Sequence, residues 1–207
     1  MVPSIPKFKA AYSTTSDWAK ACSEIISGIG DLPEDANLGF LYVTDIFADD
    51  LSSILAFLRK KIPIEKWTGT VGIGIAANAA DQLGRVSALE IYDNPGITVL
   101  IGAFPEGSYQ VFESGQVDDE GDPKLVVTGE GVETWLEKNT PYLSLVHGDP
   151  RNYDLPLQLS SLAVGLDTYL IGGLSSSRGE LPQIANHLTE CPISGVLFND
   201  AAPAITG

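Results

Sequence analysis

The chain has 207 residues, of which 44% are hydrophobic and 19% are charged, and its formal net charge is −15. This length fits one large domain or two small ones, and the balance of apolar and charged residues excludes a disordered chain. No apolar run approaches the ~20 residues that span a bilayer, and the N-terminus shows no secretory signal. We therefore expect a cytoplasmic protein that does not act at a membrane.

The acidic excess also argues against nucleic acid as a partner. Phosphate binding needs clustered cations, whereas the chain has 12 Lys and Arg against 27 Asp and Glu. The basic run at residues 59–61 is expected at the end of a helix, where it complements the helix dipole. Cys22, Cys191, His147 and His187 stand in unrelated contexts, so we expect no disulfide, no metal site and no cofactor.

In the first half of the chain, residues 1–11 are expected as a tail or an edge strand. Apolar residues at helical spacing predict a helix over residues 18–29, begun by a capping box of Thr14 and Asp17. A buried strand is predicted over residues 38–43, and a second amphipathic helix over residues 51–62. The next expected elements are a glycine-rich strand (67–76), a loop (77–84), two strands joined as a hairpin through residues 93–95 (85–92 and 96–104) and a short strand (109–112).

An acidic, polar segment at residues 115–123 is the best candidate for an exposed linker. The second half is then expected to alternate strands and helices. The strands are predicted at residues 124–127, 142–146, 168–174 and 195–198, and the helices around residues 132–136, 155–162 and 181–188.

The two halves resemble each other. Asp45 and Asp149 each follow a strand, and Leu51, Leu55 and Leu58 stand 104 residues before Leu155, Leu159 and Leu162. We therefore expect one domain over residues 1–207 with pseudo-repeats at residues 14–113 and 124–199. The predicted fold class is α/β, with mixed sheets built from helix-strand-helix-strand-strand units. Such units can stack their bare sheet faces into α-β-β-α layers; a single continuous mixed sheet is the alternative.

Several apolar and glycine-rich runs of the chain resemble the N-terminal domain of FIST proteins. They lie at residues 38–45, 48–51, 67–75, 172–176 and 195–198, and the resemblance extends from about residue 16 to the end. It implies a sensory or signal-transduction domain that binds a small ligand such as an amino acid. It also implies a FIST C-terminal domain as a following partner, and it assigns no catalytic residue.

The loop after the strand at residues 168–174 carries Ser175, Ser176, Ser177 and Arg178. With a helix expected next, its hydroxyls, backbone N–H groups and arginine suit a carboxylate or a phosphate. The alternative is an ordinary loop in which Ser177 caps the helix. The glycines Gly72 and Gly74 lack the spacing of a nucleotide-binding motif, so they serve close packing or leave space for a ligand.

A second polar group follows the strand at residues 142–146. It contains His147, Asp149, Arg151 and Asn152, and His147 oriented by Asp149 is a candidate general base. The alternative is a solvated turn that ends in a helix cap. Asp45, Asp49 and Asp50 form an acidic patch after the equivalent strand of the first half, and they could hold a ligand ammonium group or a divalent cation. The alternative is that two of them cap the next helix at its positive end.

These residues leave three functions open. The favoured one is a small-ligand sensor without catalysis. The alternatives are a hydrolase that uses His147 with Asp149 or a serine of the Ser175 loop, and a protein-interaction module. For the sensor we predict that a carboxylate-bearing ligand docks between the two polar loops. An arginine, Arg151 or Arg178, would meet its carboxylate, and Asp45 or Asp149 its ammonium group.

Overall fold

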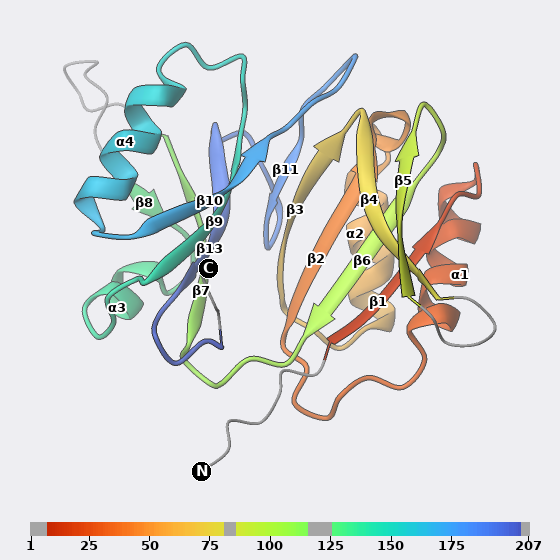
Figure 1. Ribbon diagram of the computed structural model, residues 1–207, viewed down its shortest axis with the longest axis horizontal. Helices are drawn as coiled ribbons and strands as arrows, with labels where there is room; N and C mark the ends of the chain where they lie inside the picture. Colours follow the sequence, from red (N-terminus) through yellow and green to blue (C-terminus); the bar gives the residue numbers. More distant parts are fainter. Residues whose placement is uncertain (1–7, 81–85, 116–125, 204–207) are drawn as a thin grey trace.

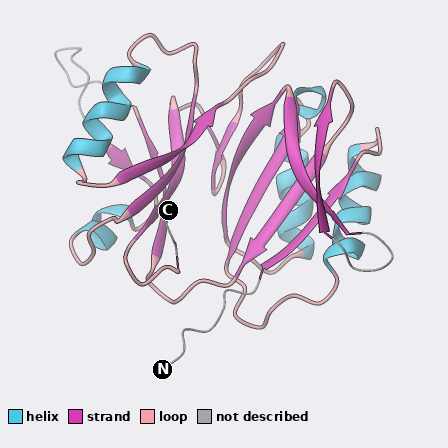
Figure 2. Ribbon diagram, in the orientation of Figure 1, coloured by secondary structure: helices cyan, strands magenta, loops and turns pink. Residues whose placement is uncertain are grey.

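The structure is a computed structural model that describes residues 8–80, 86–115 and 126–203. It has four layers, with helices on the two outer sides and two sheets between them (Figures 1 and 2). Helices α1 (Trp18–Ile29) and α2 (Leu51–Lys61) cover the first sheet, and α3 (Val132–Leu136) and α4 (Leu155–Gly165) cover the second. The predicted α/β class is confirmed, and of the two arrangements considered the layered one is present.

The first sheet has six strands in the order β1-β6-β2-β3-β11-β12. The central strand β2 lies parallel to β3 and antiparallel to β6. The strands of this sheet are β1 (Phe8–Ser13), β2 (Leu38–Thr44), β3 (Lys66–Gly72), β6 (Ile97–Gly102), β11 (Gln183–Ala185) and β12 (Leu188–Thr189).

The second sheet has five strands in the order β10-β9-β13-β7-β8. Strand β9 lies parallel to β10 and antiparallel to β13, the central strand of this sheet. The strands are β7 (Tyr109–Ser114), β8 (Val127–Thr128), β9 (Leu143–Gly148), β10 (Tyr169–Leu174) and β13 (Ile193–Phe198). A separate antiparallel pair, β4 (Gly74–Ala80) with β5 (Val86–Tyr92), completes the fold.

The strands β3-β2-β6-β1 and β10-β9-β13-β7 have the same order and the same relative directions. In each half a helix also connects the parallel pair: α2 joins β2 to β3, and α4 joins β9 to β10. Strand β7 falls inside the first predicted repeat, residues 14–113, but it pairs within the second sheet. A repeat that begins at β1 and again at β7 therefore describes this topology better, and superposition of the halves stays a prediction.

Alternating side chains of the central strands build two kinds of core. Leu41 and Val43 of β2 pack against the helices, whereas Leu38 and Phe40 face the second sheet. There they meet a cluster that includes Leu143, Val196 and Phe198. Each sheet thus has one face on its helices and one on the other sheet, so polar side chains on the inner faces lie between the two halves.

Five local predictions are wrong. The capping box fails because α1 begins one residue after Asp17, whose own carboxylate accepts the backbone N–H of Lys20 at 2.8 Å. The predicted strand 67–76 breaks at Ile73, between β3 and β4, because the N–H of Ile73 donates to Ser176 Oγ. The predicted loop 77–84 begins late, since β4 extends to Ala80, and residues 81–85 lie outside the described part.

The expected hairpin through residues 93–95 is the fourth error. β5 pairs with β4, while β6 pairs with β1 and β2, so the turn joins two different sheets. The fifth is the helix expected at residues 181–188, which is the hairpin of β11 and β12 with Asn186 at φ +66° in its turn. Its pairing with β3 outweighs the helical spacing of its apolar residues. The predicted linker and the strand at 124–127 lie outside the described residues, apart from Gly115 and the segment 126–127.

Candidate functional site

A cavity of about 360 Å³ opens where the carboxyl ends of β2, β3, β9 and β10 converge, with β4 on one side. Its lining combines apolar side chains, glycines and a few hydroxyl and imidazole groups. It consists of Tyr42, Thr70, Val71, Gly72, Gly74, Ile75, Ala76, Leu145, His147, Gly172, Gly173, Leu174 and Ser176. None of these described residues is an Asp, Glu, Lys or Arg, so the cavity suits an uncharged or weakly polar group.

Tyr42 and His147 meet at this cavity from opposite sheets. Each lies on the inner face of its strand, two residues beyond an apolar residue of the core between the sheets, Phe40 and Leu145. The Tyr42 hydroxyl is 3.0 Å from His147 Nε2, and the ring centroids are 5.5 Å apart. On the other side of the imidazole, Nδ1 lies 3.4 Å from Ser194 Oγ.

Burial keeps both rings neutral. Desolvation lowers the pKa of His147 to about 4 and raises the pKa of Tyr42 to about 12. The phenol is the stronger acid of the two neutral groups, so we assign its proton to the hydrogen bond with Nε2. The imidazole then carries its proton on Nδ1, toward Ser194.

The chains that leave β3 and β10 cross beside the cavity and bond to each other. The N–H of Ser176 donates to Val71 O at 3.3 Å, and Ser176 Oγ accepts the N–H of Ile73 at 3.0 Å. The buried hydroxyls of Thr70 and Ser175 are 2.6 Å apart. These bonds fix the rim of the cavity where the two halves meet.

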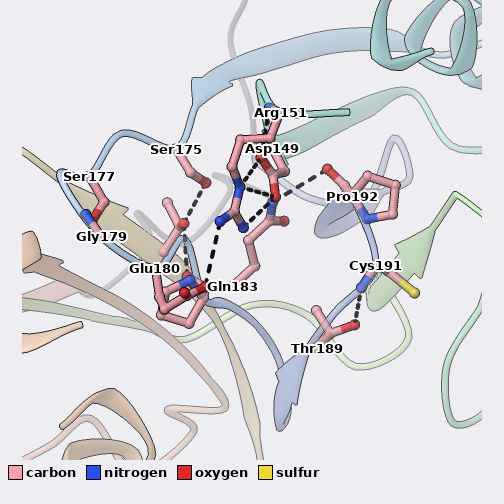
Figure 3. A network of polar contacts seen from close by, with 12 residues as sticks. Asp149, Arg151, Ser175, Ser177, Gly179, Glu180, Gln183, Thr189, Cys191 and Pro192 are labelled. Carbon is pink, nitrogen blue, oxygen red and sulfur yellow. Dashed lines mark hydrogen bonds and ion pairs between the residues drawn. The ribbon is translucent and has the colours of Figure 1, made fainter. Parts of the chain in front are cut away.

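Arg151 and Asp149 form a pair outside this cavity, in a second hollow. The Arg151 guanidinium donates to both oxygens of Asp149, and its other end reaches Glu180 at 3.5 Å (Figure 3). Burial raises the pKa of Asp149 while its hydrogen bonds to Arg151 lower it, and the net shift is downward. The arginine is already neutralised by carboxylates of the protein itself.

Arg178 and Asp45 form the other pair. The backbone N–H of Arg178 donates to Asp45 Oδ2 at 2.9 Å, and its guanidinium lies 3.4 Å from the same oxygen. The guanidinium also pairs with Asp93. Asp45 is buried, with a side chain 6% exposed, so this contact ties the end of β2 to the loop after β10.

The predicted site residues are therefore distributed over several contacts. Asp149 pairs with Arg151, and Asp45 pairs with Arg178. In each pair, the arginine predicted to bind the carboxylate of a ligand is bound to the aspartate predicted to bind the ammonium group of that ligand. Asn152 bonds to Gln158 and to the N–H of Asp154. Ser177 accepts the N–H of Gly179 in a turn, and since no helix follows, it caps none. Of the predicted serines, Ser176 lines the central cavity.

The hydrolase arrangement does not form. The His147 ring bonds to Tyr42 and Ser194, whereas Asp149 bonds to Arg151. Ser175 is buried against Thr70, and the Oγ of Ser176 accepts a backbone N–H. Within the described ranges, no serine of the loop 175–177 has a hydrogen bond to His147.

Sequence reasoning missed Tyr42 and Thr70 as site residues. Both are polar positions near the carboxyl ends of otherwise apolar strands, and ligands of open α/β sheets bind at such ends. That signal was present in the sequence. The meeting of Tyr42 with His147 was not, because it depends on how the two sheets stack.

Within the described residues, no group of three or more His, Cys, Asp or Glu could hold a metal ion. None of the described helices is long and apolar enough to cross a membrane.

Comparison with known families agrees with the resemblance seen in the sequence. The model of the FIST N domain family matches residues 37–206, which include both central strands and every residue that lines the cavity. No curated protein matches the chain. The FIST N domain is a sensory domain of signal transduction, and since the match spans most of the chain, the protein belongs to the FIST N domain family.

Proposed function

We propose that this domain senses a small molecule held in the central cavity between the two sheets. The observation that carries the proposal is the Tyr42–His147 contact, which brings two neutral polar groups to the wall of a largely apolar and glycine-lined cavity. A few convergent polar groups in an apolar hollow are typical of small-molecule sites. The hydroxyl of Tyr42 and the imidazole of His147 can orient one polar group of the ligand.

The position of the cavity suits a sensor. Its walls come from both halves: β3 and β4 from the first, β9 and β10 from the second. A ligand that contacts both sides stabilises the arrangement of the halves that fits it, and an output can follow from that shift in population. A following FIST C-terminal domain is the partner that we propose to read this shift.

The test is a thermal-shift screen of amino acids, their amides and small neutral organic molecules. A compound present at 100 times its Kd adds about 2.7 kcal/mol to the stability of the protein. Tyr42→Phe should weaken the response to a compound that raises the Tm of the wild type. Tyr109→Phe is the matched control, because its hydroxyl also makes one partly buried hydrogen bond, to Asn37 O at 2.7 Å, but does not line the cavity.

The carboxylate site between the polar loops is a second proposed location for the same ligand. A carboxylate there must displace Asp149 from Arg151 or Asp45 from Arg178, which makes this location less favourable than the cavity. Arg178→Ala and Arg151→Ala decide between them. If either substitution abolishes the ligand response and Tyr42→Phe leaves it intact, the ligand lies at the loops and the proposal for the cavity is wrong.

A further inference from the structure

The outer edges of β3 and β10 differ, although the two strands hold equivalent places in their sheets. Each lies parallel to the strand beside it, β3 to β2 and β10 to β9. The other edge of β3 is paired with β11, through the register Thr68↔Ala185, Gly69↔Ile184 and Thr70↔Gln183. Among the strands that the structure describes, β10 pairs with β9 alone.

The crossing of the two chains indicates which segment would pair with the outer edge of β10. After the crossing at Val71 and Ser176, the chain from β10 continues into β11, which pairs with β3. By the same geometry the chain from β3, which continues into β4, would pair with β10. Instead β4 pairs with β5, and residues of β4 and of β10 both line the central cavity. The cavity therefore occupies the place that a strand fills in the other half.

The walls at this place admit a polypeptide backbone. The segment 172–174 of β10 and the facing residues Gly74 and Ala76 of β4 line the cavity, and a Cβ added at Gly173 would meet no atom within 4 Å. The edge of a strand presents a row of N–H and C=O groups that can pair with an added strand. Three lining residues of β10 correspond to an added segment of about three residues at ~3.3 Å each.

We propose that the cavity binds an extended, uncharged peptide segment of about three residues, which adds to β10 as an antiparallel strand. This inference rests on the proposed function and names the chemical class of its ligand. Main-chain hydrogen bonds to an unpaired edge supply affinity in this mode, and pockets for alternate side chains supply specificity. Side chains on one face of the peptide would lie on the inner face of the sheet, beside Gly173, and those on the other face would point away from the first sheet.

The absence of charge in the described lining favours an internal or blocked segment over a free amino acid. The ammonium and carboxylate of a free amino acid would lose hydration there without gaining an ionic partner. In a blocked peptide the polar groups are amides, which the strand edge can satisfy.

The experiment uses N-acetyl-trialanine amide and the same peptide with its internal amide nitrogens methylated, which removes the donors. Titration calorimetry should show binding of the first and at least tenfold weaker binding of the second. Hydrogen exchange reports on the edge itself: at ten times its Kd the peptide should slow exchange of amides of β10 about tenfold.

Gly173→Val should weaken binding of the peptide at least tenfold, because the added side chain extends into the cavity without a clash with a neighbouring residue. Gly179→Val is the matched control, since an added Cβ there meets only Ser177 Oγ at 3.9 Å and lies outside the cavity.

The strand-addition proposal is wrong if the methylated peptide binds as tightly as the unmethylated one, or if neither peptide binds. It is also wrong if the amides at the outer edge of β10 are fully protected from hydrogen exchange in the free protein. The last result would mean that β4 itself closes onto β10. Peptide failure combined with binding of a free amino acid or neutral compound at Tyr42 overturns strand addition and leaves the proposed sensor function intact. If no compound binds in either experiment, both the strand-addition proposal and the proposed sensor function are wrong.

Discussion

Tyr42 and His147 connect the two sheets through a hydrogen bond of 3.0 Å between the phenol and Nε2. The two residues hold the same position in their halves, since each lies on the inner face of a strand that runs parallel to its neighbour. Their contact therefore joins corresponding strands of the two sheets. It buries an imidazole, whose exposed fraction is 3%, between the two sheets.

Burial of His147 predicts that the protein loses stability in mild acid. Its pKa is about 4 in the folded state and about 6.5 in the unfolded chain, so between these values the unfolded chain binds the proton more strongly. The contribution is fully present above pH 6.5 and is lost as the pH falls toward 4. The free energy of unfolding in urea should be about 2 kcal/mol lower at pH 5 than at pH 7.

His147→Gln is the control, because the amide stays neutral across this range and can still bond to Tyr42. Its free energy of unfolding should change little between pH 7 and pH 5. Carboxylates with lowered pKa values, such as Asp149, lose their contribution to the free energy of unfolding only at lower pH, so they add little to the change between pH 7 and pH 5. A wild-type protein and a variant with the same pH dependence would contradict the buried, neutral imidazole.

Two glycines should be indispensable for the parallel strand pairs. Gly69 has φ +154° and Gly172 has φ +142°, and a Cβ at either would overlap a backbone carbonyl oxygen, of Leu41 and Val146 respectively. Alanine at either position should cost about 3 kcal/mol or more, or prevent folding. Gly173→Ala, one residue away in β10, should stay within about 0.5 kcal/mol of the wild type, as measured by urea unfolding.

The two cysteines should differ sharply in reactivity. Cys22 is fully buried in α1, and desolvation raises the pKa of its thiol to about 12. Cys191 is partly exposed, although burial also raises its pKa. An aromatic disulfide reagent should therefore modify one thiol in the native protein and both in urea. Cys191→Ser should leave no fast-reacting thiol, and modification of Cys22 at native rates would contradict the packing of α1.

Most strands and helices can be predicted from local sequence patterns. The wrong predictions occur where pairing between distant strands determines the secondary structure. Leu181, Ile184, Ala185 and Leu188 have the spacing of a helical face, but they form a hairpin because the edge of β3 accepts β11. The turn at residues 93–95 has hairpin chemistry, yet it joins different sheets. No local signal distinguishes these outcomes, since the competing partner is far away in the sequence.

The offset between the two proposed repeats also could not be predicted correctly from the sequence. Apolar residues of the helices suggest a spacing of 104 residues, whereas Tyr42 and His147, on equivalent inner faces, are 105 apart. A difference of one residue exchanges the two faces of a strand, so the polar residues that share the cavity could not be matched from the helix spacing. The predicted arginine site had a similar weakness, because sequence shows which charges are near a loop but not which of them already neutralise each other.

The final prediction concerns Arg178 as a structural partner of Asp45. The Asp45 side chain is 6% exposed, and its Oδ1 is buried without a hydrogen-bond partner among the described residues. Arg178→Ala keeps the backbone N–H that donates to Oδ2 but removes the neighbouring positive charge. The loss should be about 1–2 kcal/mol, because a buried carboxylate without its partner is costlier than a lost surface ion pair. Asp45→Asn in the Arg178→Ala background should restore part of it, and in a urea double-mutant cycle strictly additive effects would show that the pair does not stabilise the junction of β2 with the loop after β10.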